Sequence, residues 1–246
     1  MRNNTYKFLK NIKYKTGALA LIDPDSKNDK KLNHIVEKIN FSGFDAILIG
    51  GSFVDDDQTH NRVKKIKEIT SKPLILFPGS STQVNKYVDA ILYLSLISGR
   101  NSKYLIEEHV KSSLKIYKLN IETIPVGYIL VDGERKSAVE KVSNTTPIDS
   151  NDFDLILSHA LAGQYLGYKF IFLEAGSGAK KCIDKELIKT LKNYLKIPLI
   201  VGGGIVDCKN VEDVKSGNPD FIVIGNFLEI EGNIEEVKKM VELIHE

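Results

Sequence analysis

The sequence predicts a (β/α)8 barrel, in which a closed ring of eight parallel strands is surrounded by helices. Short apolar runs alternate with longer amphipathic segments from one end of the chain to the other. This alternation is typical of parallel α/β proteins. The apolar runs number eight, and the length of 246 residues is close to that of a typical barrel of this kind. We therefore expect one domain that spans residues 1–246.

The strands and several helices can be placed from the pattern of apolar residues. The expected strands are 18–23, 46–50, 73–77, 90–96, 125–131, 169–173, 198–201 and 221–224. Apolar residues recur at intervals of three and four near 32–39, 187–195 and 234–244, which indicates helices that bury one face. Asp184 is placed to cap the amino end of the second of these helices.

Two segments depart from the regular pattern. About a dozen residues separate the third and fourth strands, which is too few for a full crossover helix, so the third β/α unit is expected to be irregular. Residues 133–151 are polar and show no helical period. A loop of this length in a compact domain is usually a lid or a binding loop.

The composition excludes several classes of protein. The formal net charge is +2, which gives no electrostatic case for nucleic-acid binding. Cys182 and Cys208 lie far apart without metal-ligand spacing, so neither a disulfide framework nor a zinc site is expected. The amino-terminal residues resemble no signal peptide and no run is long enough to span a membrane, so we expect a cytoplasmic protein. None of the five histidines is expected to be catalytic.

Glycines follow the last three expected strands. Gly176-Ser177-Gly178, Gly202-Gly203-Gly204 and Gly225-Asn226 each come after an apolar run. In a barrel of this type, the loops after the seventh and eighth strands commonly bind phosphate. Glycine lets backbone N–H groups approach an anion closely. The alternative is that these glycines only form tight turns, but their occurrence at two consecutive strands favours a phosphate site.

Two carboxylates are expected at the same end of the barrel. Asp23 shares a strand face with Leu19 and Leu21, and Ser52 follows the neighbouring strand. This pair suits Mg2+, which prefers oxygen ligands; alternatively, Asp23 caps the turn at Pro24.

The second of these carboxylates, Glu174, shares a face with Phe170 and Phe172 beside the glycine run. It is a candidate general base for a substrate hydroxyl. Alternatively, it is a structural partner for Lys180 or Lys181.

Taken in order, these motifs resemble those of the geranylgeranylglyceryl phosphate synthases. The resemblance is to the second group of that family, the PcrB-like polyprenylglyceryl phosphate synthases, and it runs from about residue 17 to residue 230. The matching segments are LIDPD (21–25), IGGS (49–52), GYILVDG (127–133), VEKVSNT (139–145), FLEAGSG (172–178), VGGGI (201–205) and GN (225–226).

The resemblance implies a function and a set of site residues. The enzyme would join the C3 hydroxyl of sn-glycerol 1-phosphate to a polyprenyl diphosphate, with geranylgeranyl diphosphate as the expected donor. Asp23 and Ser52 would bind Mg2+, and Glu174 would be the base. Glycerol phosphate would be bound by Phe172, Leu173, Glu174, Ala175, Gly176, Ser177, Gly178, Gly203, Gly204, Gly225 and Asn226. We also expect a homo-oligomer, and contact with a membrane surface on account of the lipid product.

The chain differs from the family pattern at two places. Phe172 stands where the family commonly has tyrosine, so one hydroxyl that could contact substrate is missing. Residues 133–138 include Arg135 and Lys136, which either assist the diphosphate or are solvated loop charges. Two other functions stay open: a phosphosugar isomerase or aldolase on the same barrel, and a non-catalytic protein that binds phosphate or lipid.

Overall fold

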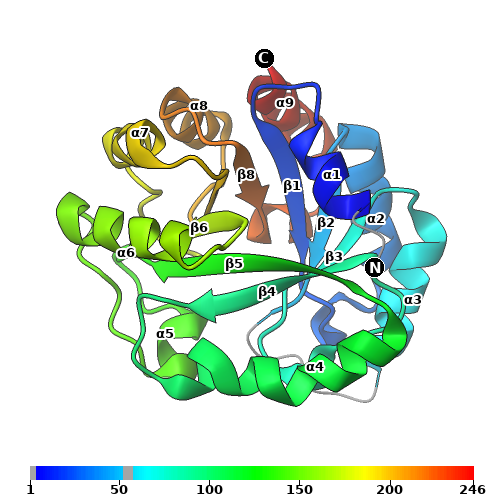
Figure 1. The fold of residues 1–246 in the computed structure, drawn as a ribbon. Coiled ribbons are helices and arrows are strands. Elements are labelled where there is room, and N and C mark those ends of the chain that lie inside the picture. The colour runs from blue at the N-terminus through cyan, green and yellow to red at the C-terminus, as the bar shows by residue number, and fades with distance from the viewer. Residues whose placement is uncertain (1–3, 52–57) are drawn as a thin grey trace.

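The computed structural model describes residues 4–51 and 58–246, and its eight parallel strands close into a barrel (Figure 1). Each strand pairs with its neighbours in the order of the sequence, and β8 pairs with β1. The predicted (β/α)8 fold is therefore confirmed. The strands are β1 Gly17–Ile22, β2 Ala46–Ile49, β3 Leu74–Leu76, β4 Ala90–Leu96, β5 Glu122–Leu130, β6 Phe170–Glu174, β7 Leu199–Gly202 and β8 Phe221–Ile224.

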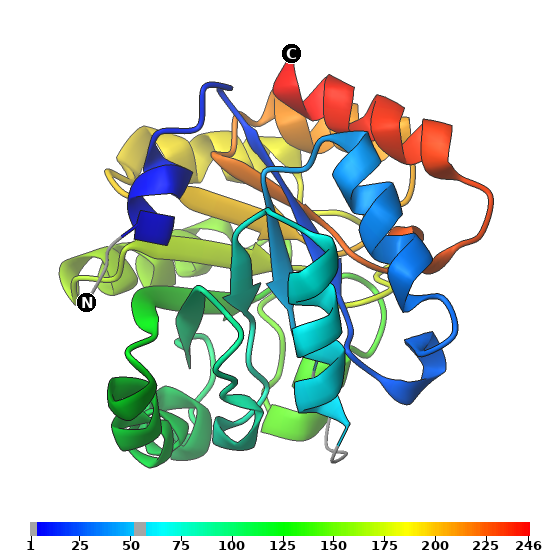
Figure 2. The ribbon, with the colours of Figure 1, turned by 90° about the vertical axis from the view of Figure 1, so that its right-hand side faces the viewer.

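Helices surround the strands and bury their apolar faces against them (Figures 1 and 2). Asp184 caps α7 as predicted, because its side chain accepts a hydrogen bond from the backbone N–H of Glu186. The principal outer helices are α2 Leu32–Ser42, α3 Thr59–Ile69, α4 Glu108–Leu119, α6 Phe153–Tyr165, α7 Lys185–Tyr194, α8 Cys208–Ser216 and α9 Ile234–His245. In the part of the chain that the structure describes, no helix has the length and apolar character needed to cross a bilayer.

The inside of the barrel is filled by apolar side chains, and a short helix packs at its amino-terminal end. Helix α1, Asn4–Lys10, places Tyr6 against Phe170 with ring centroids 5.6 Å apart. The buried carboxylate of Glu122, at the start of β5, accepts hydrogen bonds from the backbone N–H groups of Thr5 and Tyr6. A carboxylate at a helix amino terminus satisfies backbone donors that have no partner within the helix. The carboxyl-terminal end of the barrel is where the cavities lie.

The third β/α unit is irregular, as the sequence predicts. Between β3 and β4 the chain forms only a short 3₁₀ turn, Ser81–Gln83. The next helix, α4, is preceded by a π-helical turn, Lys103–Glu107, which packs against β4. As a result, no full helix of the third unit covers the outer side of β3 and β4.

The prediction for residues 133–151 is wrong in one respect, because this segment contains a helix. Helix α5, Ala138–Ser143, begins at Ser137, whose hydroxyl accepts a hydrogen bond from the backbone N–H of Glu140. Six residues make fewer than two helical turns, so no apolar period could appear in the sequence. A backbone bridge between Val131 and Ile148 brings the end of the segment back to the barrel.

The loop after β8 is anchored to helix α2 by a buried lysine. The ammonium group of Lys38 donates hydrogen bonds to the carbonyl groups of Leu228 and Ile230 and to the side chain of Asn233. The amide of Asn233 donates in turn to the carbonyl of Phe227. A buried carbonyl group such as that of Leu228 is costly when it loses its donor. Lys38 therefore fixes the turn that begins at the glycine-containing end of β8.

We expect Lys38→Met to lower the free energy of unfolding by about 3 kcal/mol, because it leaves the buried Leu228 carbonyl and two partly buried acceptors without their donor. Urea unfolding of the wild type and the variant measures this difference. Lys65→Met, at an exposed position on α3, is the control and should change stability by less than about 0.5 kcal/mol. Equal stability of Lys38→Met and the control would contradict the anchoring role.

Candidate functional site

The loops at the carboxyl-terminal ends of the strands enclose a cavity that we call the glycine-lined cavity. It holds about 1180 Å3 of empty space, including its open mouth. Residues from both sides of the barrel closure meet there, because β8 pairs with β1. The predicted site residues that line it are Asp23, Glu174, Ser177, Gly178, Gly203, Gly204, Gly225 and Asn226.

Four glycines in the loops around this cavity have backbone conformations that other residues rarely adopt. The φ angles of Gly176, Gly178, Gly203 and Gly204 lie between 69° and 100°. A Cβ atom on Gly203 would lie 2.7 Å from a Glu174 carboxylate oxygen and 2.8 Å from the Gly176 nitrogen. The glycines thus form tight turns and also allow two loops to pack closely at the cavity wall. Consecutive turns of this kind form concave sites that bind anions through backbone N–H groups.

Side chains connect the loops that form the cavity. The hydroxyl of Ser177 donates to the side-chain oxygen of Asn226, 3.1 Å away, which joins the loop after β6 to the loop after β8. Arg135 donates to the carbonyl of Gly178 at 3.0 Å. Arg135 therefore holds the glycine loop. This role differs from both expectations from the sequence, which were assistance to the diphosphate and a solvated loop charge.

Glu174 ends β6 and points to the inside of the barrel, with only 7% of its surface exposed. Its Oε1 accepts a hydrogen bond of 2.8 Å from the backbone N–H of Gly176. Within the described residues, Glu174 forms no ion pair, and Lys181 lies 3.9 Å from Glu134 instead. Burial raises the pKa of Glu174 to about 7, although the Gly176 hydrogen bond acts in the opposite direction. A carboxyl group with this pKa can accept a proton near neutral pH.

Asp23 lies beyond the end of β1 and lines the glycine-lined cavity. Among the described residues, its buried Oδ1 has no hydrogen-bond partner. Its Oδ2 lies 3.7 Å from the ammonium of Lys27, which also lies 3.4 Å from Glu229. Burial raises the pKa of Asp23 above its ordinary value, against the attraction of Lys27. The side chain of Asn28 donates to both the Asp23 carbonyl and Glu229, and so holds this corner in place.

The Oδ1 of Asp23, which no donor in residues 4–51 and 58–246 reaches, fits a metal ligand better than a turn residue. The residue that caps the turn after Pro24 is Asp25, not Asp23, because the Asp25 side chain accepts a hydrogen bond from the backbone N–H of Lys27. A buried carboxylate oxygen without a donor is suited to a hard cation such as Mg2+. No group of three or more His, Cys, Asp or Glu residues that could hold a metal occurs in residues 4–51 and 58–246, so water and substrate oxygens would complete the shell. Ser52 lies outside the described residues.

Four of the predicted substrate contacts are not part of the cavity wall, namely Phe172, Leu173, Ala175 and Gly176. Phe172 is fully buried below the cavity, with its ring centroid 5.6 Å from that of Phe77 and 5.3 Å from that of Tyr128. Leu173 is fully buried on the outer face of the sheet, among residues that pack on the helices. Of residues 172–176, only Glu174 lines the cavity.

A second hollow, which we call the apolar groove, is lined by β4, by the loop after β3 and by α4. It holds about 830 Å3 of empty space, part of it open to solvent. Residues 78–81 and Val84 of the short connection between β3 and β4 form part of its wall. Apolar and aromatic side chains dominate its wall: Phe77, Val84, Ile91, Tyr93, Leu94, Leu96, Tyr104, Tyr128, Val139 and Val142, beside His109, Ser112 and Glu108.

The apolar groove and the glycine-lined cavity are adjacent and share part of their walls. Gly51, Phe77, Tyr128 and Val139 line both of them. The side chain of His109 is buried in the groove wall, where desolvation lowers its pKa and favours the neutral form. Sequence reasoning did not find these groove residues. The short connection between the third and fourth strands was the signal that could have located them.

We expect Glu174→Gln to stabilise the folded protein at neutral and alkaline pH. In the unfolded chain the carboxyl group ionises near its ordinary pKa of 4.5, whereas the folded protein keeps the proton until about pH 7. Stability of the wild type therefore falls as the pH rises through this window, and glutamine removes the effect.

The gain of Glu174→Gln over the wild type should grow to on the order of 3 kcal/mol between pH 4.5 and pH 8. Urea unfolding at both pH values measures it, with the exposed substitution Glu212→Gln as control. A difference between wild type and Glu174→Gln that does not change with pH would contradict the shifted pKa.

Comparison with known proteins identifies the family. A model of the PcrB family matches residues 10–243. Geranylgeranylglyceryl phosphate synthase from Flavobacterium johnsoniae is 43% identical over 209 residues, which are 85% of this chain and 86% of that protein. The synthase from Methanosphaera stadtmanae is 36% identical over 227 residues, which are 92% of this chain and 93% of that protein.

A solved structure extends the agreement to three dimensions. The structure of (S)-3-O-geranylgeranylglyceryl phosphate synthase from Thermoplasma acidophilum, in complex with its substrate sn-glycerol-1-phosphate, superposes with a TM-score of 0.92 at 31% identity. The match covers 100% of this chain and 99% of that one. The family model, the identity with the relatives and the shared fold agree: this chain belongs to the PcrB family of geranylgeranylglyceryl phosphate synthases.

Proposed function

We propose that this protein is a Mg2+-dependent prenyltransferase that joins the C3 hydroxyl of sn-glycerol 1-phosphate to a prenyl diphosphate and releases diphosphate. The observation that carries this proposal is that the glycine-lined cavity and the apolar groove lie side by side and share four lining residues. One hollow suits a small phosphorylated acceptor, and the other suits a long hydrocarbon tail. Relatives that share 36–43% of their residues bear the name of this synthase.

The glycine-lined cavity is the proposed site of the acceptor. Backbone N–H groups in the loops of Gly178, Gly203, Gly204 and Gly225 would bind the phosphate, as glycine turns do in other anion sites. Glu174 would then face the glycerol hydroxyls. With a pKa of about 7, this carboxylate is a stronger base than an ordinary glutamate. It can therefore accept the hydroxyl proton near neutral pH.

The apolar groove is the proposed site of the prenyl tail. Its wall offers mainly apolar area, and burial of that area against a hydrocarbon chain is favourable in water. Asp23, at the edge of the cavity, would hold Mg2+ together with Ser52. When bound there, Mg2+ would neutralise charge on the diphosphate and so make it a better leaving group. The expected donor remains geranylgeranyl diphosphate.

Bond formation would take place where the two hollows meet. The oxygen of the C3 hydroxyl forms a bond to C1 of the prenyl chain, the bond from C1 to diphosphate breaks, and Glu174 takes the hydroxyl proton. Phe77 and Tyr128 line this junction, with ring centroids 5.9 Å apart. Aromatic faces stabilise positive charge, such as that which develops at an allylic carbon. Burial holds the pKa of Tyr128 well above its ordinary value, so its hydroxyl stays protonated.

The other functions considered from the sequence are not favoured. The solved structure of another phosphate-handling enzyme on this barrel, thiamine phosphate pyrophosphorylase from Pyrococcus furiosus, is only 12% identical and shares the fold alone. A phosphosugar isomerase would also have no use for a long apolar groove. Cytoplasmic location and a homo-oligomeric state stay predictions.

The direct test is product formation from labelled sn-glycerol 1-phosphate, Mg2+ and prenyl diphosphates of several lengths. We expect label to become extractable into organic solvent, and removal of Mg2+ by a chelator to stop the reaction. Glu174→Gln should lower kcat by about 100-fold or more while glycerol phosphate still binds, because a general base commonly contributes at least that factor.

The matched control is Glu140→Gln, a substitution in α5 outside both hollows. It should leave kcat within about twofold of the wild type. Absence of extractable product with every donor would overturn the prenyltransferase proposal. A normal kcat for Glu174→Gln would instead remove only the role of Glu174 as base.

A further inference from the structure

Helix α4 carries a second apolar stripe on the side that faces away from the barrel. Its inner face lines the apolar groove through Glu108, His109 and Ser112. On the outer face, Val110, Leu114 and Tyr117 are 66%, 71% and 74% exposed, and Ile106 in the preceding turn is 56% exposed. These residues recur at intervals of three and four, so they form one continuous stripe along the helix. A soluble domain rarely exposes such a stripe without a partner for it.

Lysines border the stripe. Lys111, Lys115 and Lys118 are exposed on α4, and residues 109–119 contain no acidic side chain. Lys111 lies 3.5 Å from Glu108, whereas Lys115 and Lys118 form no ion pair with any described residue. An exposed helix with an apolar stripe and a row of lysines has the composition of helices that lie in the surface of an anionic membrane. Each such lysine strengthens attachment to anionic lipid.

We propose that this outer face of α4 docks the protein on an anionic lipid bilayer. The inference rests on the proposed function, because a prenyltransferase with its donor site in the groove has a reason to place α4 against a bilayer. The same helix forms a wall of the groove on one side and presents the stripe on the other, so a bilayer bound to α4 lies next to the groove. A prenyl donor or lipid product could then pass between groove and bilayer with little exposure of its tail to water.

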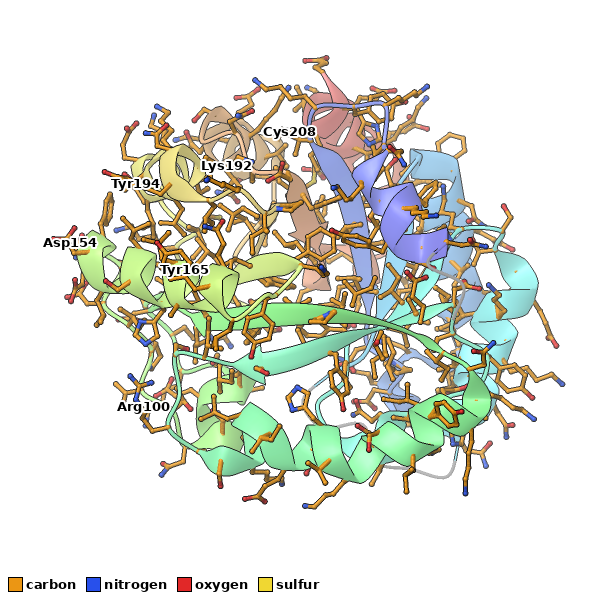
Figure 3. The ribbon with its side chains drawn as sticks, viewed as in Figure 1. Arg100, Asp154, Tyr165, Lys192, Tyr194 and Cys208 are labelled. Atoms are coloured by element: carbon orange, nitrogen blue, oxygen red, sulfur yellow. The ribbon has the colours of Figure 1, made fainter. Side chains whose placement is uncertain are left out.

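A second copy of the chain suits this face less well. A two-fold symmetric contact through α4 would bring the same row of lysines together from both copies. Lysine is also depleted in protein–protein interfaces. Another exposed apolar patch, which includes Tyr165 and Tyr194 on α6 and α7, lies on a different side of the barrel from α4 (Figure 3). It does not adjoin the groove.

Vesicle co-sedimentation tests the docking surface. We expect the wild type to bind vesicles that contain phosphatidylglycerol, to bind pure phosphatidylcholine vesicles weakly, and to dissociate as salt is raised. The triple substitution of Lys111, Lys115 and Lys118 by Gln should weaken binding by about 100-fold. The control substitutes Lys185, Lys189 and Lys196 by Gln, changes the net charge equally, and should retain binding.

The apolar stripe is tested with Val110→Ser combined with Leu114→Ser, against Tyr165→Ser combined with Leu166→Ser as the matched control. Only the α4 pair should lose binding to vesicles. All the α4 variants lie outside both hollows, so they should turn over a short, water-soluble prenyl diphosphate at the wild-type rate.

The outcomes separate the two proposals. Turnover of the short donor by a wild type that does not bind vesicles overturns the docking surface and leaves the prenyltransferase proposal intact. Binding that both lysine triples reduce equally reflects net charge alone and also overturns the docking surface. The docking surface is also overturned if the wild type does not bind vesicles and the Val110 and Leu114 substitutions convert an oligomer to a monomer. Sedimentation velocity measures this conversion. Vesicle binding without turnover of any donor removes the prenyltransferase proposal instead.

Discussion

The connection between β3 and β4 is too short to leave one strand, form a helix and return to the next. A regular crossover unit needs a helix to cover the outer face of its strands, and this chain has room only for the 3₁₀ turn Ser81–Gln83. On the outer side of β4, Tyr93 contacts His109 of the next helix, α4, and both residues line the apolar groove. The proposed donor site therefore follows from the absence of a full helix in the described residues between β3 and β4. Helix α4 has one face toward the groove and another toward solvent.

The acceptor side depends on close packing of glycines around one carboxylate. Glu174 is buried at the end of β6, and Gly203 leaves just enough room for its oxygen. The same burial that raises the pKa of Glu174 to about 7 makes the ionised form costly for the folded protein. The burial that lowers the stability of the folded protein thus also makes Glu174 a base that works near neutral pH, as is common in active sites.

Much of the fold and part of the site could be predicted from the sequence, because both depend on local patterns. Alternating apolar runs located all eight strands, and glycines after strands located the cavity containing Glu174. Helix α5 was missed because six residues show no period. The groove residues Tyr93, His109 and Ser112 could not be found, since they meet only when α4 packs against β4. The burial of Phe172 likewise depends on Phe77 and Tyr128, from other strands.

The central claim is that the apolar groove holds the prenyl tail. Its most direct test is the donor preference of Ser112→Trp, which places a large ring in the groove, compared with Ser113→Trp on the exposed side of the same helix. With folding checked by circular dichroism, we predict that Ser112→Trp lowers kcat/KM by about 100-fold or more for a long prenyl diphosphate. We predict that it retains activity with a short donor, while Ser113→Trp behaves as the wild type. An unchanged preference for the long donor in a folded Ser112→Trp variant would contradict the claim.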